Sequence, residues 1–190
     1  MEFATGTVEL EPLQNGILEL LRSANYLQAF ENTIVQGVLQ TEAYARSVFE
    51  GVRGLYPVSA DDIDAAIKAR MVRRELIDGK RQFEIILTEH ALTAPLASED
   101  VMRGQMAHLL ECLDLPGMTI GVIPRGVVLN QPWAFSITNS VRVDLDQYGG
   151  PLTVTDPAAV ARFRGVFDEL RGLAVYGDDV RALITGLMPA

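Results

Sequence analysis

Hydrophobic positions recur at helical spacing through the first part of the chain, separated by polar residues that favour helix starts. A helix is predicted over residues 11–29, where Leu18, Leu21 and Leu27 supply apolar positions. Residues 1–10 are small and polar without a clear period, so we expect a flexible N-terminal segment there. The pattern therefore places the start of the folded chain near residue 11.

Two more helices follow, each opened by a residue type that caps helices well. Thr41 is a good N-cap for the first of them. Ser59 caps the second, which is predicted to end at Asp78 and Gly79. Two predicted helical boundaries therefore depend on one hydroxyl each.

Gly37 lies in an apolar stretch just before the helix that Thr41 caps. Glycine adopts backbone conformations that other residues avoid, so Gly37 is predicted to let the chain turn sharply. Gln40 and Tyr44 stay near that turn, where they either shape a pocket or satisfy buried backbone groups. We favour the structural role for both.

The pattern changes to strands in the second half of the chain. Residues 82–92 are apolar on both faces and predict a buried strand that ends near Glu89. Further strands are predicted in the runs MTIGVIP, WAFSITN, VRVDLDQ and PLTVT. Asp156 followed by Pro157 predicts the N-cap and first residue of a final long helix. The order predicts a mixed β-sheet covered by helices, α+β or α/β, in one domain over residues 11–190.

Composition and charge restrict what this domain contacts. Of 190 residues, 48% are hydrophobic and 22% charged, which is typical of a folded globular protein. No apolar run approaches the roughly 18 residues of a membrane-spanning helix, so we expect no membrane contact. The net charge of −9 repels a phosphate backbone, so we expect no direct contact with nucleic acid. The single cysteine, Cys112, excludes an internal disulfide and fits a cytoplasmic protein.

Motifs for common cofactors are absent from the sequence. There is no glycine-rich phosphate loop and no GxSxG nucleophile turn. His90 and His108 lack the spacing of a zinc site, and Cys112 is predicted to be a core residue. We therefore expect no cofactor and no metal.

Charged residues at two places are the candidates for chemistry. Glu89 and His90 follow a predicted strand, where sites tend to form and where the pair could exchange protons, although a structural or solvated histidine is the more ordinary interpretation. In the third predicted helix, Arg70 and Arg74 fall within the apolar arc. An internal salt bridge, with Glu89 or Glu31 as partner, is favoured over recognition of an anionic ligand.

Several stretches resemble one protein family. The run VQGVLQTEAYAR is similar to the VPGLLQTxxYAR signature of an actinobacterial domain of unknown function that follows Xre-type helix-turn-helix domains in transcriptional regulators, some of them antitoxin-like. IKARMVRRELI resembles its RxxRQxxL helix, with Arg70 and Arg73 on the arginines. The later matches place Glu89, Gln105 and Phe135 on an acidic residue, a glutamine and a phenylalanine of the family. The similarity runs from about residue 17 to the C-terminus.

The sequence also departs from that family. Gln36 replaces the proline before the glycine, and Arg74 replaces the glutamine after the second arginine. A helix-turn-helix needs roughly 50 to 60 residues. Because the match begins near residue 17, we expect none within this chain, whether it was removed or is naturally absent.

The resemblance implies an effector- or partner-sensing domain that binds a small molecule or a small protein in a pocket between sheet and helices. The residues that it and the charge pattern nominate for ligand binding are Gln40, Tyr44, Arg70, Arg73, Arg74, Glu89, Gln105 and Phe135. The last helix carries an apolar stripe that suits either the domain's own sheet or a homodimer seam.

Two other functions stay open at this stage. The first is a stand-alone, cofactor-independent enzyme of natural-product biosynthesis, a cyclase or isomerase. Its acid and base candidates are Glu89, His90, Asp144, Asp146 and Tyr148, with Arg70 and Arg74 holding an anionic group. The second is an antitoxin-like protein-interaction module.

Overall fold

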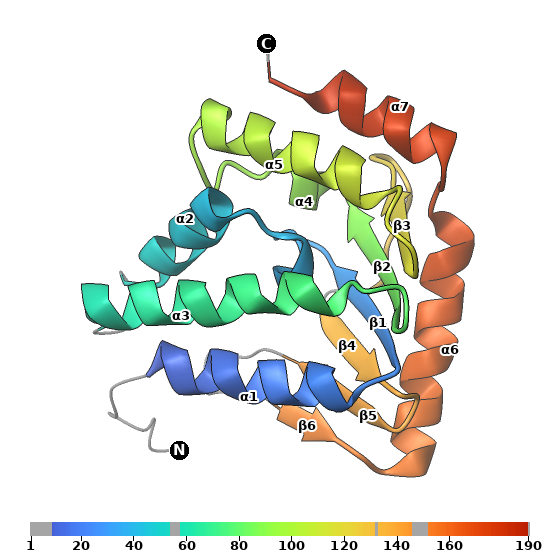
Figure 1. Cartoon of the computed structure of the whole chain (residues 1–190). Coiled ribbons are helices and arrows are strands. Elements are labelled where there is room, and N and C mark those ends of the chain that lie inside the picture. Colours follow the sequence, from blue (N-terminus) through green and yellow to red (C-terminus); the bar gives the residue numbers. More distant parts are fainter. Residues whose placement is uncertain (1–8, 54–57, 132, 146–151, 190) are drawn as a thin grey trace.

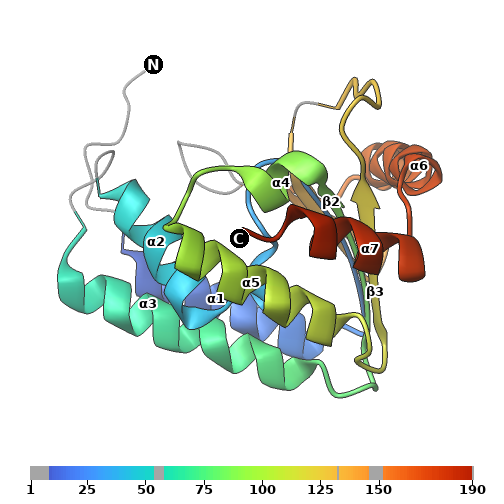
Figure 2. The same cartoon turned by 90° about the horizontal axis from the view of Figure 1, so that it is seen from above.

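The chain folds as a single α+β domain built on a six-stranded mixed sheet (Figure 1). The computed structural model describes residues 9–53, 58–131, 133–145 and 152–189. Helix α6 (Pro157–Leu173) lies alone over one face of the sheet and the other helices lie on the opposite side, which Figure 2 shows from above. The predicted architecture of a mixed sheet covered by helices is therefore confirmed. Within these described ranges, no helix is long and apolar enough to cross a membrane.

The sheet joins a parallel half to an antiparallel half. Its order is β3-β2-β1-β4-β5-β6, with β1, β2 and β3 parallel and β4, β5 and β6 antiparallel to their neighbours. The strands are β1 (Tyr26–Glu31), β2 (Gln82–Thr88), β3 (Met118–Ile123), β4 (Phe135–Thr138), β5 (Arg142–Leu145) and β6 (Leu152–Val154). The carboxyl ends of the three parallel strands therefore meet at one edge of the sheet.

Three helices begin at the capping residues that the sequence indicated, Thr41, Ser59 and Asp156. Each of these accepts a hydrogen bond from a backbone N–H of the first helical turn, and Ser98 caps α5 in the same way. The helices are α1 (Leu10–Ser23), α2 (Glu42–Val52), α3 (Ala60–Val72), α4 (Glu89–Thr93), α5 (Glu99–Cys112), α6 (Pro157–Leu173) and α7 (Asp178–Leu187). Two 3-10 helices, η1 (Gly37–Leu39) and η2 (Arg73–Leu76), complete the described elements.

The prediction of a helix over residues 11–29 was wrong in its last six residues. Helix α1 ends at Ser23, and Tyr26–Glu31 forms strand β1 in the interior of the sheet. Leu27 and Phe30 point to opposite faces of the sheet and both are buried. A central strand that is apolar on both faces has no alternation to distinguish it from a buried helix, so periodicity alone could not separate the two.

The final helix was predicted as one element and is two. Helix α6 ends at Leu173, and α7 begins at Asp178. Between them Val175 forms an antiparallel bridge with Val122, so the connecting segment covers part of the outer edge of β3. Gly177 adopts a φ of 58°, which favours glycine, at the start of α7.

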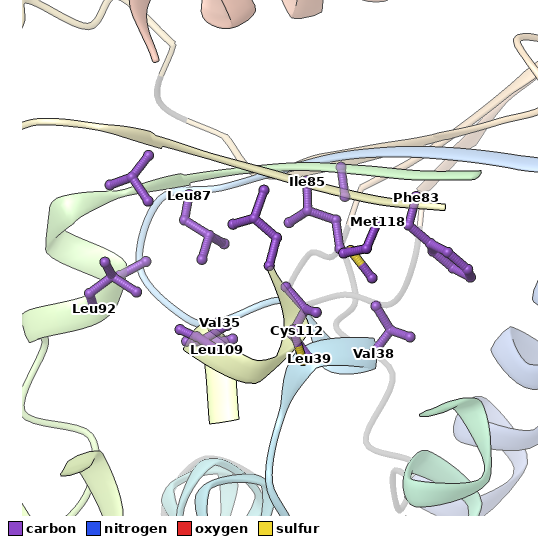
Figure 3. Packing of buried hydrophobic residues seen from close by; sticks show 14 of the residues in the cluster. Val35, Val38, Leu39, Phe83, Ile85, Leu87, Leu92, Leu109, Cys112 and Met118 are labelled. Carbon is purple, nitrogen blue, oxygen red and sulfur yellow. The ribbon is translucent and has the colours of Figure 1, made fainter. Parts of the chain in front are cut away.

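Buried side chains form a core on each face of the sheet, and a third, smaller cluster lies among α1, α2 and α3. The core on the face opposite α6 includes Val35, Leu39, Ile85, Leu87 and Leu109, which Figure 3 shows packed together. The other core lies between the sheet and α6. Cys112 is fully buried in the first core, which confirms the prediction, and burial raises the pKa of its thiol to about 11. The thiol is therefore protonated at neutral pH.

One ion pair fastens α6 to the sheet. Arg171 of α6 donates to Glu84 of β2, with Nε 2.5 Å from Oε1 and Nη2 2.8 Å from Oε2. Tyr26 and Gln28 of β1 also donate to this carboxylate. Burial opposes ionisation of Glu84, but these hydrogen bonds outweigh it and hold the pKa of the carboxyl below its ordinary value of 4.5.

This depressed pKa predicts a defined dependence of stability on pH. The unfolded chain binds the proton of Glu84 more tightly than the folded chain, so the stabilisation is complete above the ordinary pKa and is lost as the pH falls through the folded-state pKa. Glu84→Gln should lower the free energy of unfolding by about 1–2 kcal/mol near pH 7 and much less near pH 3. Urea unfolding at both pH values measures this, and an equal effect at both would contradict the assignment.

Candidate functional site

An open hollow lies at the edge of the sheet where the three parallel strands end. Its volume is about 420 Å³, and it is lined by Asn32 after β1, by residues 88–90 after β2 and by residues 123–125 after β3. In sheets with parallel strands, ligands bind outside the carboxyl ends of the strands, because the loops that follow them converge there. The segment between β3 and β4 lines one side of the hollow through Gly126, Val127, Leu129 and Gln131.

The lining combines apolar and polar side chains. Ile123, Pro124, Val127 and Leu129 supply the apolar surface. Asn32, Glu89, His90, Arg125 and Gln131 supply the polar groups. Small-molecule sites have this composition, since apolar surface provides affinity and a few placed polar groups provide orientation. The strand end that sequence analysis singled out at Glu89 and His90 is therefore part of a concave surface.

Glu89 ties two loops of the hollow together. Its Oε2 accepts a hydrogen bond of 2.8 Å from the backbone N–H of Arg125, and its Oε1 lies 3.4 Å from Nε of the same arginine. The Glu89 side chain is 15% exposed, whereas that of Arg125 is 76% exposed. Thr88 makes the second tie, because its hydroxyl donates to the carbonyl of Asn32 and also caps α4. The prediction that Glu89 pairs with an arginine of the third helix was wrong, because its partner is Arg125.

Three nominated residues lie elsewhere, around a buried segment between β1 and α2. Gln40, Tyr44 and Gln105 are each fully buried. The Tyr44 hydroxyl accepts from the N–H of Val35, and the Gln40 amide donates to the carbonyl of Val35 at 2.6 Å. Buried peptide groups need such partners. Gln40 and Tyr44 therefore satisfy buried backbone groups, which is the role favoured for them from the sequence.

Gln105 of α5 serves the other end of the same segment. Its side-chain oxygen accepts from the N–H of Thr41 at 2.7 Å, and its side-chain nitrogen donates to the carbonyl of Leu39 at 2.8 Å. Gln36, which stands where the resembling family has proline, accepts from the N–H of Val38 and so caps η1. Glutamine side chains from three places therefore satisfy backbone groups between residues 35 and 41.

Two arginines join this segment to α1. Arg70 donates to the side-chain oxygens of Gln14 and Gln40, at 3.1 Å and 2.6 Å. Its guanidinium also stacks over the ring of Phe49, 4.2 Å from the centroid. Arg73 donates to both the backbone carbonyl and the side-chain oxygen of Gln14, at 2.8 Å and 2.6 Å. We call Gln14, Gln40, Arg70 and Arg73 the amide–guanidinium cluster.

The helical arc had placed Arg74 beside Arg70 on the interior face, and this was wrong. Arg73 is 3% exposed, whereas Arg74 is exposed and contacts His108 of α5. Helix α3 ends at Val72 and continues as the tighter η2. A 3-10 helix has three residues per turn, so it aligns Arg73 with Arg70 and turns Arg74 outward.

The sequence predicted that Gly37 permits a sharp turn through an unusual backbone angle, and this was wrong. Gly37 belongs to η1 and its φ is not positive. A side-chain carbon added to Gly37 would lie 3.4 Å from Nη1 of Arg73 and 3.7 Å from Nε of Arg70. The absent side chain therefore leaves space for two guanidinium groups.

The candidates for an enzyme do not converge. The carboxylate of Asp144 is held by Arg142 at 2.8 Å and by the hydroxyl of Thr153 at 2.7 Å. Strands β2 and β5 are separated by β1 and β4, which puts Glu89 and Asp144 at least about 14 Å apart. His90 is exposed at the hollow, and Asp146 and Tyr148 lie outside the described residues. Within those residues no three metal-binding side chains gather.

The last nominated residue, Phe135, belongs to the core beneath α6. Its ring lies 5.2 Å from that of Phe163 and 6.1 Å from that of Phe30. Of the eight residues nominated for ligand binding, Glu89 alone lines the hollow. Ligand binding by the other seven stays a prediction, although six of them are occupied in core packing or in the hydrogen bonds described above.

Comparison with known proteins identifies the family. A family described as "Domain of unknown function (DUF5753)" matches residues 14–186. The chain belongs to this family. No curated protein matches it. Two solved structures show distant likeness, an archaeal chromatin protein, TrmBL2, and a phospholipase D family member, Nuc from Salmonella typhimurium.

The likeness to both structures is weak. TrmBL2 is 14% identical, with a TM-score of 0.41 over 88% of this chain and 49% of its own, so the chain spans about half of that protein. Nuc is 12% identical, with a TM-score of 0.43 over 85% of this chain and 88% of its own. The candidate site of this DUF5753 domain is therefore defined by the contacts of its own residues.

Sequence reasoning missed Gln14, Arg125 and Gln131. Gln14 could have been found, because it lies one turn before Leu18 on the buried side of α1, where an amide needs a partner. Arg125 and Gln131 belong to an irregular segment without periodicity, so only the folded chain brings them to Glu89 and His90.

The space beside Gly37 predicts a steric threshold. Gly37→Ala adds one carbon at ordinary contact distance and should change the free energy of unfolding by less than about 1 kcal/mol. Gly37→Val adds methyl groups that reach the guanidinium groups, and should destabilise by about 1–3 kcal/mol. Urea unfolding of both variants measures this. Equal stability of the two would contradict the close-approach role.

The burial of Arg73 predicts unequal effects for adjacent arginines. Arg73→Met removes the two hydrogen bonds that Nη2 gives to Gln14, while Arg70 still donates to the side-chain oxygen, so it should destabilise by about 1–3 kcal/mol. Arg74→Met, the matched control on the exposed side, should stay within about 0.5 kcal/mol of the parent. Denaturant midpoints compare the two, and a larger effect at Arg74 would refute the assignment.

Proposed function

We propose that this domain is the effector-sensing part of a transcriptional regulator, and that the effector binds in the hollow at the carboxyl edge of β1, β2 and β3. The observation that supports this most is the hollow itself, where three loops bring polar groups next to apolar side chains. The link to Xre-type regulators of actinobacteria comes from the resemblance of the VQGVLQTEAYAR run and the motifs that follow it.

The connection from the hollow to α1 supplies a route for signalling. Asn32 lines the hollow, and its carbonyl is held by Thr88. The chain then runs to Val35, whose carbonyl is held by Gln40, and Gln40 shares Arg70 with Gln14 of α1. In regulators of the kind that the sequence resembles, the DNA-binding domain precedes this one, so α1 is the element that would meet it.

A ligand acts on such a route only through different affinities for two arrangements of the protein. An effector that holds Asn32 and the lining residues after β3 together would favour one position of the segment from Asn32 to Gln40, and with it one position of α1. The coupling is reciprocal, so a change at α1 would alter the affinity for the effector equally.

A small protein partner is the second candidate, and a specific surface favours it. Val128 is 80% exposed and Trp133 is 66% exposed, on the segment that borders the hollow. Apolar groups that stay exposed beside a concave surface are typical of interaction sites. An antitoxin-like contact would use this surface. An enzymatic function has less support, because Glu89 and Asp144 lie apart and each is paired with its own arginine.

Native mass spectrometry of protein purified from its own host tests the proposal, with a denatured sample beside it. The folded chain should retain a small molecule that is released on denaturation. Gln131→Trp, which puts a large ring into the lining, should remove the retained mass. Val128→Trp, on the same segment but pointing to solvent, should keep it.

Each other outcome decides against effector binding in the hollow. A retained polypeptide would favour the protein-partner function. Retention that is unchanged in Gln131→Trp would place the molecule elsewhere in the domain. A bare chain, as monomer or homodimer, would contradict the sensing proposal.

A further inference from the structure

The charges within the hollow point to a class of ligand, an inference that rests on the proposed function. Glu89 is the one carboxylate among the lining residues. Its Oε2 is used by the backbone N–H of Arg125. Its Oε1 lies 3.4 Å from Nε of Arg125 and receives no hydrogen bond from any described residue. One carboxylate oxygen therefore has capacity for a stronger donor.

The cation that now faces this oxygen is held weakly. The Arg125 side chain is 76% exposed, and its ion pair with Glu89 lacks the paired hydrogen bonds that Arg171 makes with Glu84. In an ion pair with one exposed partner, the exposed side chain readily leaves its partner for water. The backbone bond from Arg125 to Glu89 does not depend on the side chain, so the guanidinium can leave without opening the loop.

Apolar surface lies next to the same carboxylate. The residues that line the hollow with Glu89 include Ile123, Val127 and Leu129, of which Ile123 is 1% exposed. The chain's net charge of −9 also attracts cations and repels anions at a distance. A ligand that complements this arrangement carries a positively charged nitrogen beside an apolar group.

We propose that the hollow binds an organic amine or guanidine whose cationic nitrogen replaces the Arg125 side chain at Oε1 of Glu89, with its apolar part over Ile123, Val127 and Leu129. The Arg125 guanidinium then occupies the ligand's position in the free protein. Displacement of one cation by another leaves Glu89 paired in both states, so binding does not leave a half-buried charge without a partner.

Phenethylamine is a suitable probe, because it is cationic at neutral pH and carries one aromatic ring. Titration into ¹⁵N-labelled protein should shift amide resonances of the lining residues. Glu89→Gln removes the negative charge and should weaken binding about tenfold. Arg125→Met removes the competing cation while keeping the backbone bond and an unbranched side chain like the aliphatic stem of arginine, so it should strengthen binding. Glu99→Gln, a charge-matched change at an exposed position of α5, should leave the affinity unchanged.

The anionic counterpart 3-phenylpropionate provides the opposing test. It should bind the parent more weakly than phenethylamine does. Tighter binding of the anion, or weaker amine binding in Arg125→Met, would overturn the proposal, because Arg125 would then be the recognition group. No shift with either probe would also overturn it.

The two proposals fail separately. If the protein from its host retains a neutral or anionic molecule that Gln131→Trp releases, effector binding in the hollow stands and the cationic class is wrong. If nothing is retained but phenethylamine binds as described, the cationic preference stands and the sensing role loses its support.

Discussion

Backbone groups buried between β1 and α2 are the constraint on which the rest of the helical layer depends. The chain passes through the interior there, with Val35, Val38 and Leu39 almost completely buried. Buried peptide groups need hydrogen-bond partners, and an irregular segment lacks the regular backbone hydrogen bonds of a helix or sheet. The partners come from α2, α5 and the segment's own glutamines, while Arg70 and Arg73 extend the same hydrogen bonds to α1. Four helices are thereby positioned by one short stretch of main chain.

This requirement separates two groups of residues that the sequence had placed together. The glutamines, the tyrosine and the arginines of the signature motifs face inward, and their described contacts are with backbone groups and with one another. The concave surface lies at the far end of the same segment, where Asn32 follows β1 and Glu89 follows β2. Signature residues therefore hold the scaffold, and the loops after the parallel strands provide the surface proposed to bind a ligand. The segment from Asn32 to Gln40 belongs to both.

Features that depend on residues close in sequence, such as helix caps, could be predicted. Features that depend on tertiary packing could not. The caps at Thr41, Ser59 and Asp156 were found because one side chain satisfies one helical turn. Strand β1 was missed because a central strand shows no alternation, and Arg73 was confused with Arg74 because a switch from α to 3-10 geometry leaves no mark in the apolar pattern. Glu89 was nominated as a site residue from the sequence, but its partner Arg125 lies 36 residues away in an aperiodic loop.

A crystal structure of the protein purified from its host, with the retained molecule in place, tests the central claim most directly. The account predicts electron density for that molecule at the carboxyl edge of the sheet, against Ile123 and Leu129 and within hydrogen-bond distance of Glu89, with the amide–guanidinium cluster unchanged. Density that lies instead among Gln40, Arg70 and Arg73, with their mutual hydrogen bonds replaced by bonds to the ligand, would contradict the account and make the signature residues the binding site.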